Sequence, residues 1–272
     1  MKFSILIAHF NNGEYFKACY ESIINQTYTN WEAIILDDAS QPEEIELVKK
    51  TIGTDKRFSF YKNDKNEGVG FTKKQLIEYA TGDICCFVDP DDALINNALE
   101  IIRNTYSAKG CIATYSQFHN CDENLKITGL FPYTRKIKNG NSHFLNIRFE
   151  VAHLFTFKKE VYEQTDKMDA SLTSSVDQDL YLKLYEKGNF EYIKVPLYLY
   201  RHHKSGVSQD PNKKKKLYKN WHIVLLNTLK RRNIEYIYGT KVSSIENIPE
   251  FLYNKESSIL HKIKRKFNEI WS

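Results

Sequence analysis

Apolar and polar residues alternate in blocks along the first 115 positions of the chain. Mainly apolar segments of the length of buried strands occur at 3–8, 33–36, 58–61, 84–88 and 111–115. Apolar residues between these runs recur at helical spacing, which predicts helices over 15–24, 43–52, 72–80 and 95–106. Strands that alternate with helices of this length predict an α/β fold, with right-handed crossovers and a mainly parallel sheet covered on both faces.

This rhythm breaks after about residue 117. Beyond it we expect a hairpin or irregular segment over 121–150 with a helix near 142–148, a strand over 151–157, a helix over 177–186 and a strand over 192–200 interrupted at Pro196. From residue 212 the pattern becomes helical and basic. We therefore expect three parts, namely 1–117, 118–209 and a basic helical tail over 210–272.

The composition is that of a globular protein with a sizeable core. Tyr (18) and Phe (16) are plentiful and Gly (11) and Pro (6) scarce in 272 residues, which excludes low-complexity disorder. No apolar run approaches the length of a membrane span, and the run at 3–8 is too short for a signal peptide. The five cysteines form no C-x-x-C pair, so we expect core residues rather than a zinc or redox site, and a cytoplasmic location.

Polar residues follow three of the predicted strands. They are the segments 11–13, 37–40 and 89–92. In an open parallel sheet, ligands bind beyond the carboxyl ends of the strands, so chemistry is expected where these segments meet.

The segment 89–92, Asp-Pro-Asp-Asp, carries the sharpest signal. Three carboxylates this close repel one another unless a cation or hydrogen-bond donors neutralise them, and such oxygen ligands suit Mg²⁺ or Mn²⁺. The alternative is an acidic turn in which Asp92 caps the next helix. Segment 37–40 has two similar interpretations. It is either a turn that caps the next helix, or it supplies an acid that accepts hydrogen bonds from a nucleobase or ribose. Segment 66–70, Asn-Glu-Gly-Val-Gly, is a plain turn or brings backbone amides close to a phosphate, with Lys73 nearby.

The order of these segments resembles the family 2 glycosyltransferases. Segments 4–11, 21–28, 31–40, 66–68 and 81–92 carry the resemblance. It is close over residues 3–115 and patchy from there to about residue 209. The resemblance implies the GT-A fold, with a nucleotide-sugar-binding half at 1–117 continuous with an acceptor-binding half at 118–209. It also implies inverting transfer from a nucleotide sugar, usually a UDP-sugar, with Mn²⁺ or Mg²⁺.

The resemblance also assigns roles on the donor side. Asp38 is expected to contact the uracil, with Ala8, His9 and Asn11 lining the base and ribose pocket. Asp89 is expected near the ribose or donor sugar, Asp91 as the metal ligand of a D-x-D motif, and Lys73 facing the diphosphate. Ala8-His9 replaces the more usual Pro-Thr, and Lys73-Lys74 the frequent Arg-Asn, which leaves the choice of donor open.

The second half is expected to supply the base. Segment 175–184 is similar to the family's Glu-Asp-x-Asp-Leu segment, which implies Asp177 as the catalytic base, with Asp179 as the alternative. From spacing alone, both acids could simply cap a helix. Segment 200–208 resembles a family stretch through which Arg201 or His203 approaches the diphosphate or the metal as a lid closes. The plain alternative is that the two histidines, His202 and His203, are only exposed residues of a polar loop.

Other functions and partners fit the sequence less well. A nucleotidyltransferase would need a Gly-rich phosphate loop near the first strand, and a catalytically lapsed scaffold would not need Asp38, Asp91 and Asp177 together. The basic run at 213–216 lacks interleaved aromatic residues, so we expect no nucleic-acid binding.

The tail over 255–272 places apolar and aromatic residues at helical spacing between lysines. Such a helix either packs on the domain or lies on an anionic membrane surface. By family analogy we expect a glycan or lipid-linked acceptor in surface polysaccharide synthesis, with possible peripheral contact at the inner face of the membrane.

Overall fold

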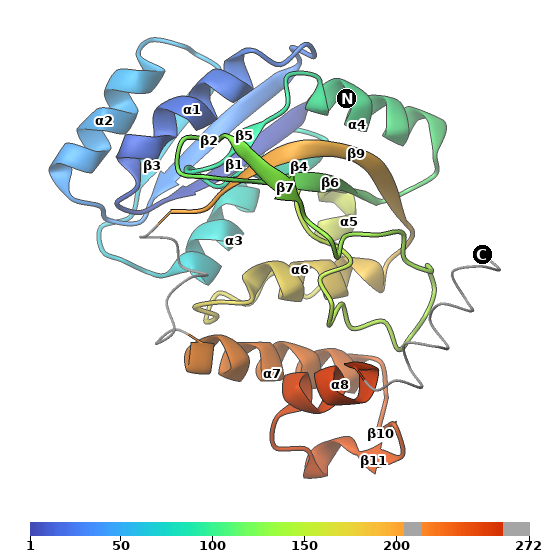
Figure 1. Ribbon diagram of the computed structural model, residues 1–272. Coiled ribbons are helices and arrows are strands. Elements are labelled where there is room, and N and C mark those ends of the chain that lie inside the picture. Colours follow the sequence, from blue (N-terminus) through green and yellow to red (C-terminus); the bar gives the residue numbers. More distant parts are fainter. Residues whose placement is uncertain (204–213, 258–272) are drawn as a thin grey trace.

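A single mixed sheet organises the computed structural model, which describes residues 1–203 and 214–257 (Figure 1). Its strand order is β3-β2-β1-β4-β8-β6-β9-β5, with β7 paired to β6. The strands are β1 (Phe3–His9), β2 (Trp31–Asp37), β3 (Phe58–Lys62), β4 (Ile84–Phe87), β5 (Ala93–Leu94), β6 (Ala113–Cys121), β7 (Ile127–Leu130), β8 (Phe155–Lys158) and β9 (Phe190–Arg201). The predicted parallel arrangement is confirmed for β3, β2, β1 and β4 and for β6 with β9, whereas β8, β7 and β5 pair antiparallel.

Helices cover both faces of this sheet. They are α1 (Gly13–Ile24), α2 (Pro42–Ile52), α3 (Val69–Tyr79), α4 (Ala98–Ala108), α5 (Lys159–Tyr162), α6 (Val176–Tyr185), α7 (Lys214–Arg231) and α8 (Ile248–Ser257), with a short ribbon β10 (Tyr236–Ile237) and β11 (Thr240–Lys241) and the 3-10 turn η3 (Val242–Ser244) between α7 and α8. The strands and helices predicted before residue 115 are all present, with ends shifted by a few residues. No helix in the described part of the chain is long and apolar enough to cross a membrane.

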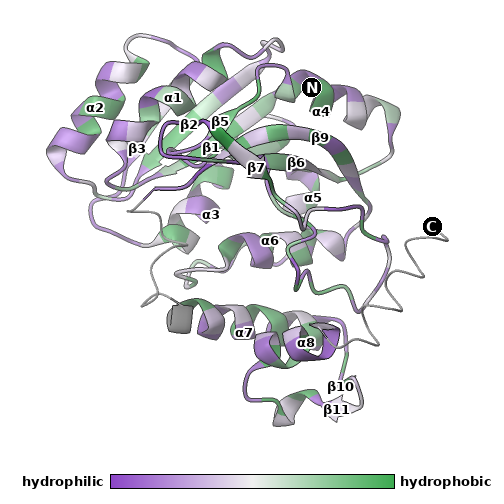
Figure 2. Cartoon of the chain, viewed as in Figure 1, coloured by the Kyte–Doolittle hydropathy of each residue, from purple (hydrophilic) through white to green (hydrophobic). Residues whose placement is uncertain are grey.

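The strand β1 shows why both faces are covered. Ile5 and Ile7 are buried in one core cluster with residues of α1 and α4, while Leu6 between them belongs to a second cluster with residues of α3, α6 and α7. Because successive strand residues point to opposite faces, one continuous apolar run supplies both cores. In Figure 2 the green hydrophobic colour accordingly fills the central strands, and purple residues lie on the outer helices.

The helix predicted near residues 142–148 is absent, and this prediction is wrong. The Asn146 side chain bonds to the backbone N–H and C=O of Val151, both at 2.9 Å, and to Gln178 Oε1 at 3.0 Å. Asn146 and Phe149 also have positive φ angles of 50° and 56°. Local side-chain bonds to the backbone compete with helix formation, and here they hold an irregular loop against α6 instead.

Two strand predictions also need correction in detail. The strand predicted over 151–157 begins only at Phe155, and its predicted first residue, Val151, is instead held in the preceding loop by Asn146. Pro196 does not end β9. The pairing with β6 shifts register around Gln117, which opposes Pro196, so the missing N–H falls at a bulge. Of the hairpin or irregular segment expected over 121–150, the structure has the turn and second strand of the β6–β7 hairpin, whose first strand ends at Cys121, followed by irregular chain.

Candidate active site

Three polar segments meet at one edge of the sheet, as the sequence predicts. β2, β1 and β4 are parallel neighbours, so their carboxyl ends place Asp38, Asn11 and Asp89 at the same edge. The helix α6 approaches this edge with its N-terminus, where Asp177 lies in the first turn. Acids distant in sequence are therefore brought into one region.

Asp38 organises the loop that precedes α3. Its Oδ1 atom accepts hydrogen bonds from Asn63 Nδ2 and Glu67 N, both at 2.8 Å, and its Oδ2 atom accepts one from Gly68 N at 2.9 Å. The side chain is buried. Asp38 thus fixes the segment 66–68 beside the site, and its contact with a uracil stays a prediction.

His9 lies beneath the site rather than on its surface. Its Nδ1 atom is 2.7 Å from Asp37 Oδ2, and the same carboxylate accepts bonds from the hydroxyl and backbone N–H of Ser40. Burial alone would raise the pKa of Asp37, but these bonds outweigh it and lower that pKa. Because His9 is fully buried, it supports the loop after β2, and a direct contact with the donor stays a prediction.

Asn11 joins the same two loops. Its Oδ1 atom accepts a hydrogen bond from Gln41 N at 2.9 Å, and its backbone N–H donates to Ser40 Oγ at 2.9 Å. Ala8, one residue before His9, is half-buried against the core on the α3 side. These two residues therefore occupy the predicted edge, Asn11 as a tie between the loops and Ala8 as part of the floor.

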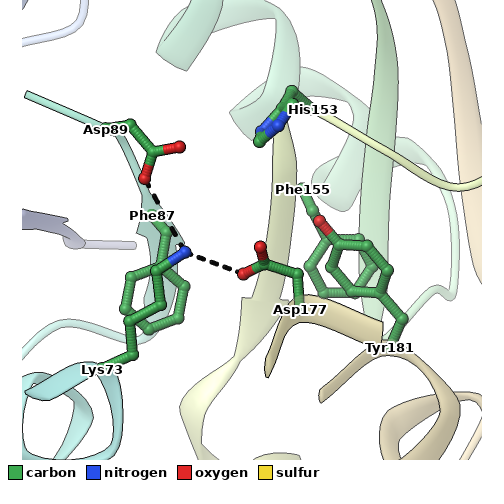
Figure 3. A pocket seen from close by; sticks show the side chains of 7 residues that line it. All are labelled: Lys73, Phe87, Asp89, His153, Phe155, Asp177 and Tyr181. Carbon is green, nitrogen blue, oxygen red and sulfur yellow. Dashed lines mark hydrogen bonds and ion pairs between the residues drawn. The ribbon is translucent and has the colours of Figure 1, made fainter. Parts of the chain in front are cut away.

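Lys73 connects two acids from opposite halves of the chain. Its Nζ atom donates a hydrogen bond to Asp177 Oδ1 at 2.9 Å and lies 3.7 Å from Asp89 Oδ1 (Figure 3). The Lys73 side chain is 6% exposed, whereas about a third of each carboxylate remains exposed. The Lys73 ammonium is therefore buried, whereas the carboxylates of Asp89 and Asp177 are partly accessible to solvent.

This arrangement fixes the charge of each group. Burial alone would lower the pKa of Lys73, but the two carboxylates outweigh it and raise that pKa above its usual range. Burial alone would raise the pKa of Asp177, but the charge and hydrogen bond of Lys73 hold it below its usual value. At neutral pH the site therefore contains an ionised Asp177 carboxylate.

The pocket around Asp177 is completed by aromatic side chains. Phe87, His153, Phe155 and Tyr181 line it together with Lys73, Asp89 and Asp177 (Figure 3). Phe155 and Tyr181 pack at 4.2 Å between ring centroids and form an apolar wall beside Asp177. Burial lowers the pKa of His153, which favours its neutral form. The pocket thus combines the two carboxylates and the Lys73 ammonium with an apolar wall of aromatic rings.

Asp179, the alternative base, is structural. Its Oδ2 atom accepts hydrogen bonds from Asp169 N at 2.9 Å and Lys183 Nζ at 2.8 Å, and its side chain is buried. It does not line the pocket that Asp177 faces. The geometry therefore favours Asp177 over Asp179.

Asp91 and His203, the two predicted metal ligands, are in direct contact, and their binding of a metal stays a prediction. His203 Nε2 is 2.7 Å from Asp91 Oδ2. Within residues 1–203 and 214–257, no group of three or more His, Cys, Asp or Glu side chains has a metal-binding arrangement. Divalent cations that bind nucleotides take few protein ligands and complete their shell with phosphate oxygens and water. The pair of donors fits such an ion.

Arg201 is anchored to backbone carbonyl groups. Its Nε donates to Asp91 O and its Nη1 to Glu123 O, both at 2.5 Å, and its guanidinium lies over the Tyr15 ring. It therefore ties the β6–β7 hairpin to the acidic loop. Its predicted contact with the donor diphosphate stays a prediction.

Asp92 stabilises the acidic turn at 89–92, but it does not cap a helix. It accepts hydrogen bonds from Tyr198 OH at 2.8 Å and Arg201 N at 2.7 Å, while Tyr198 OH accepts one from Asp89 N at 3.1 Å. Burial, reinforced by Asp91 and Asp89, raises the pKa of Asp92. These bonds fasten the end of β9 to the acidic loop.

His153, Phe155 and Tyr181 line the pocket without belonging to any of the predicted site segments. His153 precedes β8 and approaches Asp177 only because β8 is inserted next to β4. Tyr181 lies one helical turn after Asp177, so its spacing was a usable signal.

Comparison with known proteins assigns the chain to a family. The family model of Glycosyl transferase family 2 matches residues 4–166. Hyaluronan synthase of Pasteurella multocida is 25% identical over 96% of this chain, and chondroitin synthase of Escherichia coli 27% identical over 70%. The chain spans only 26% and 27% of these two relatives.

Solved structures show the same fold. Residues 1–349 of TarS of S. aureus superpose with a TM-score of 0.68 at 16% identity, covering 84% of this chain and 66% of that TarS fragment. Its complex with UDP-GlcNAc gives the same TM-score. From the family match over more than half of its length and from this likeness of fold, the chain belongs to glycosyltransferase family 2 and has the GT-A fold.

Proposed function

We propose that this chain is an inverting glycosyltransferase that moves a sugar from a UDP-sugar to a hydroxyl group of a glycan or lipid-linked acceptor. The observation that carries the proposal is the meeting of Asp89 and Asp177 around one Lys73 ammonium. It brings the acid motif of the nucleotide-binding half to the acid of the second half. Residues 1–117 would bind the donor, residues 118–209 the acceptor, and residues 210–272 form the tail.

Asp177 acts as the base in this proposal. Its carboxylate takes the proton of the acceptor hydroxyl as that oxygen attacks the anomeric carbon from the face opposite the nucleotide. The lowered pKa keeps it ionised at neutral pH, and the wall of Phe155 and Tyr181 limits the access of water. Lys73 holds Asp177 in place from the donor side.

Asp91 and His203 would hold Mn²⁺ or Mg²⁺. When bound, such an ion supplies positive charge that offsets the charge developing on the leaving diphosphate. Asp38, Asn11, Ala8 and His9 shape the nucleoside end of the donor site, with Arg201 near the diphosphate.

The donor, acceptor and location are part of the proposal. The names of the relatives, hyaluronan and chondroitin synthase, support surface polysaccharide synthesis with transfer of a hexosyl or N-acetylhexosaminyl group. The TarS complexes with UDP and UDP-GlcNAc support a UDP-sugar. We place the enzyme in the cytoplasm, with peripheral contact at the inner membrane face through 255–272. Residues 258–272 lie outside the part of the chain that the structure describes.

Thermal melting with nucleotides tests the donor site. UDP, GDP, dTDP and CMP are each added with and without Mn²⁺. A ligand at 100 times its dissociation constant adds about 2.7 kcal/mol, which raises the melting temperature by roughly 5–10 °C at this size. We expect this shift with UDP and Mn²⁺. A shift with another nucleotide alone contradicts the UDP-sugar assignment, and no shift at all contradicts the proposed function.

The variant Asp177→Asn tests the base. We expect it to keep the melting shift with UDP and Mn²⁺ and to lose transfer from UDP-sugars, measured as acceptor-dependent UDP release. Asp166→Asn is the matched control, because Asp166 is an exposed carboxylate outside the pocket. Retained transfer by Asp177→Asn would refute the assignment.

A further inference from the structure

Tyr15 lies beside the predicted metal ligands, although no predicted site segment contains it. The centroid of its ring is 4.5 Å from that of the His203 ring, and the Arg201 guanidinium lies over the same tyrosine ring at 4.8 Å. The Tyr15 hydroxyl group donates a hydrogen bond to Glu123 Oε1 at 3.2 Å. One side chain of α1 therefore contacts the end of β9, the residue that follows it and the turn of the β6–β7 hairpin.

The start of α1 explains how Tyr15 reaches this place. Gly13 begins the helix, and its backbone N–H donates to Glu44 Oε2 at 2.6 Å. A Cβ atom on Gly13 would lie 2.9 Å from Glu44 O, so the first turn of α1 packs closely against α2. Phe16 is fully buried in the core, whereas Tyr15 is half-buried. The first turn thus places one aromatic ring in the core and the preceding one beside the site.

His203 is held by contacts of two kinds. Its Nε2 atom is 2.7 Å from Asp91 Oδ2, which fixes one edge of the imidazole. The Tyr15 ring lies against the imidazole at an interplanar angle of 51°. The His203 side chain is buried. The acid sets the position of one ring nitrogen, and the tyrosine sets the tilt of the imidazole ring.

Arg201 shares the Tyr15 ring and is tied to the acidic segment 89–92. Its backbone N–H donates to Asp92 Oδ1 at 2.7 Å, and its Nε atom donates to Asp91 O. A guanidinium over an aromatic face is attracted by the negative charge of that face. Arg201 and His203 therefore depend on the same ring for part of their position.

The distance between Asp91 and His203 suits two ligands of one ion. Mg²⁺ binds its ligands at about 2.0–2.1 Å in octahedral geometry, so neighbouring ligand atoms are about 3 Å apart. The observed 2.7 Å between His203 Nε2 and Asp91 Oδ2 is close to this separation. The two side chains therefore need little movement to bind an ion, as long as the Tyr15 ring keeps the imidazole in its present orientation.

We propose that Tyr15 is a positioning residue for the metal site. Its ring holds His203 against Asp91 and holds Arg201 against the acidic segment, so that the ion and the diphosphate meet side chains already in place. This inference rests on the proposed function and adds to it a residue of the first helix that acts through His203 and Arg201. Replacement of a side chain that orients a metal ligand lowers metal affinity about 10- to 100-fold.

Mn²⁺ binding in the presence of saturating UDP tests the proposal, with free Mn²⁺ measured by electron paramagnetic resonance. We expect Tyr15→Ala to weaken Mn²⁺ binding about tenfold or more, and Tyr15→Phe, which keeps the ring, to retain the affinity of the wild type. Tyr20→Ala is the matched control. Tyr20 is a half-buried tyrosine of the same helix, and its ring packs on Phe58 of β3 at 5.1 Å. This control should lower the melting temperature and leave Mn²⁺ binding unchanged.

A further variant separates loss of the ring from a general loss of fold. Tyr15→Leu keeps an apolar side chain, and we expect it to lose Mn²⁺ affinity as Tyr15→Ala does while melting no lower than Tyr20→Ala. Wild-type Mn²⁺ affinity in Tyr15→Ala and Tyr15→Leu overturns the positioning role alone. A loss in Tyr15→Phe or Tyr20→Ala as large as in Tyr15→Ala overturns it as well. Failure of the wild-type protein to bind Mn²⁺ with UDP overturns the proposed function, and this inference with it.

Discussion

The close contact between α3 and the segment before α6 offers a sensitive test of the catalytic geometry. Gly70, in the first turn of α3, donates its backbone N–H to Leu172 O at 3.1 Å. A Cβ atom at this position would lie 2.9 Å from Asp169 O and closer still to Leu172 O. All these neighbours are backbone atoms, so they cannot move aside as a flexible side chain would.

The variant Gly70→Ala should therefore separate Lys73 from Asp177. Restoring an ordinary contact distance of 3.4 Å at the closest atom requires a shift of about 1 Å. Lys73 lies one helical turn after Gly70, and Asp177 follows the 169–172 segment. Moving α3 away from that segment therefore lengthens the 2.9 Å hydrogen bond between Lys73 Nζ and Asp177 Oδ1. We expect a loss of activity of about 100-fold, because misplacement by 1 Å has effects of that size. The strain should cost about 1–3 kcal/mol of stability, or roughly 3–8 °C in melting temperature.

Acceptor-dependent UDP release and thermal melting measure the two effects. Gly110→Ala is the matched control, because nothing lies within 4 Å of a Cβ atom there, and it should change neither. If Gly70→Ala kept the activity and melting temperature of the wild type, α3 and the 169–172 segment could move apart without loss of stability or activity. The reasoning from their contact would then be refuted.

Two further predictions concern charge. Lys73→Met removes the charge that lowers the pKa of Asp177, so that pKa should rise. The acid limb of the pH–rate profile should therefore move to higher pH. An unchanged acid limb would show that Lys73 does not control the pKa of the base. Asp37→Asn removes a buried carboxylate that His9 and Ser40 bind, and should cost about 2–3 kcal/mol at neutral pH. Because the pKa of Asp37 is lowered, its contribution is present above the unfolded value and fades as the pH falls through the folded value. Melting curves of wild type and variant should therefore converge in acid, and a constant difference would contradict this account.

The sequence predicted best where local pattern and tertiary burial agree. The segment 3–8 became β1 because a strand that is mainly apolar on both faces is stable between two helical layers. The loop around Asn146 shows the opposite case. The sequence there has a helical pattern, but the Asn146 side chain forms hydrogen bonds with Val151 and Gln178 that hold the chain as a loop. Gln178 is far from Asn146 in sequence, so the local pattern does not reveal this contact.

Some parts of the candidate site could likewise be predicted from local pattern, and others depend on tertiary contacts. The acids at the ends of β2 and β4 could be located because strand ends in a parallel sheet share an edge. The pairing of Lys73 with Asp177 could not, because it depends on how α6 approaches α3. His9 shows that a polar residue at a strand end can face the interior, and only the position of Asp37 reveals this.

The place of β8 in the sheet limits how this enzyme can move. β8 follows β6 in sequence but lies between β4 and β6, so one unbroken hydrogen-bonded ladder joins the two ends of the sheet. A rotation of one half against the other, as in hinged enzymes, would have to tear this ladder. If the chain acts as proposed, closure over a substrate must use loops at the rim of the sheet rather than a hinge through it. The sheet would then keep the two proposed substrate sites at a constant distance.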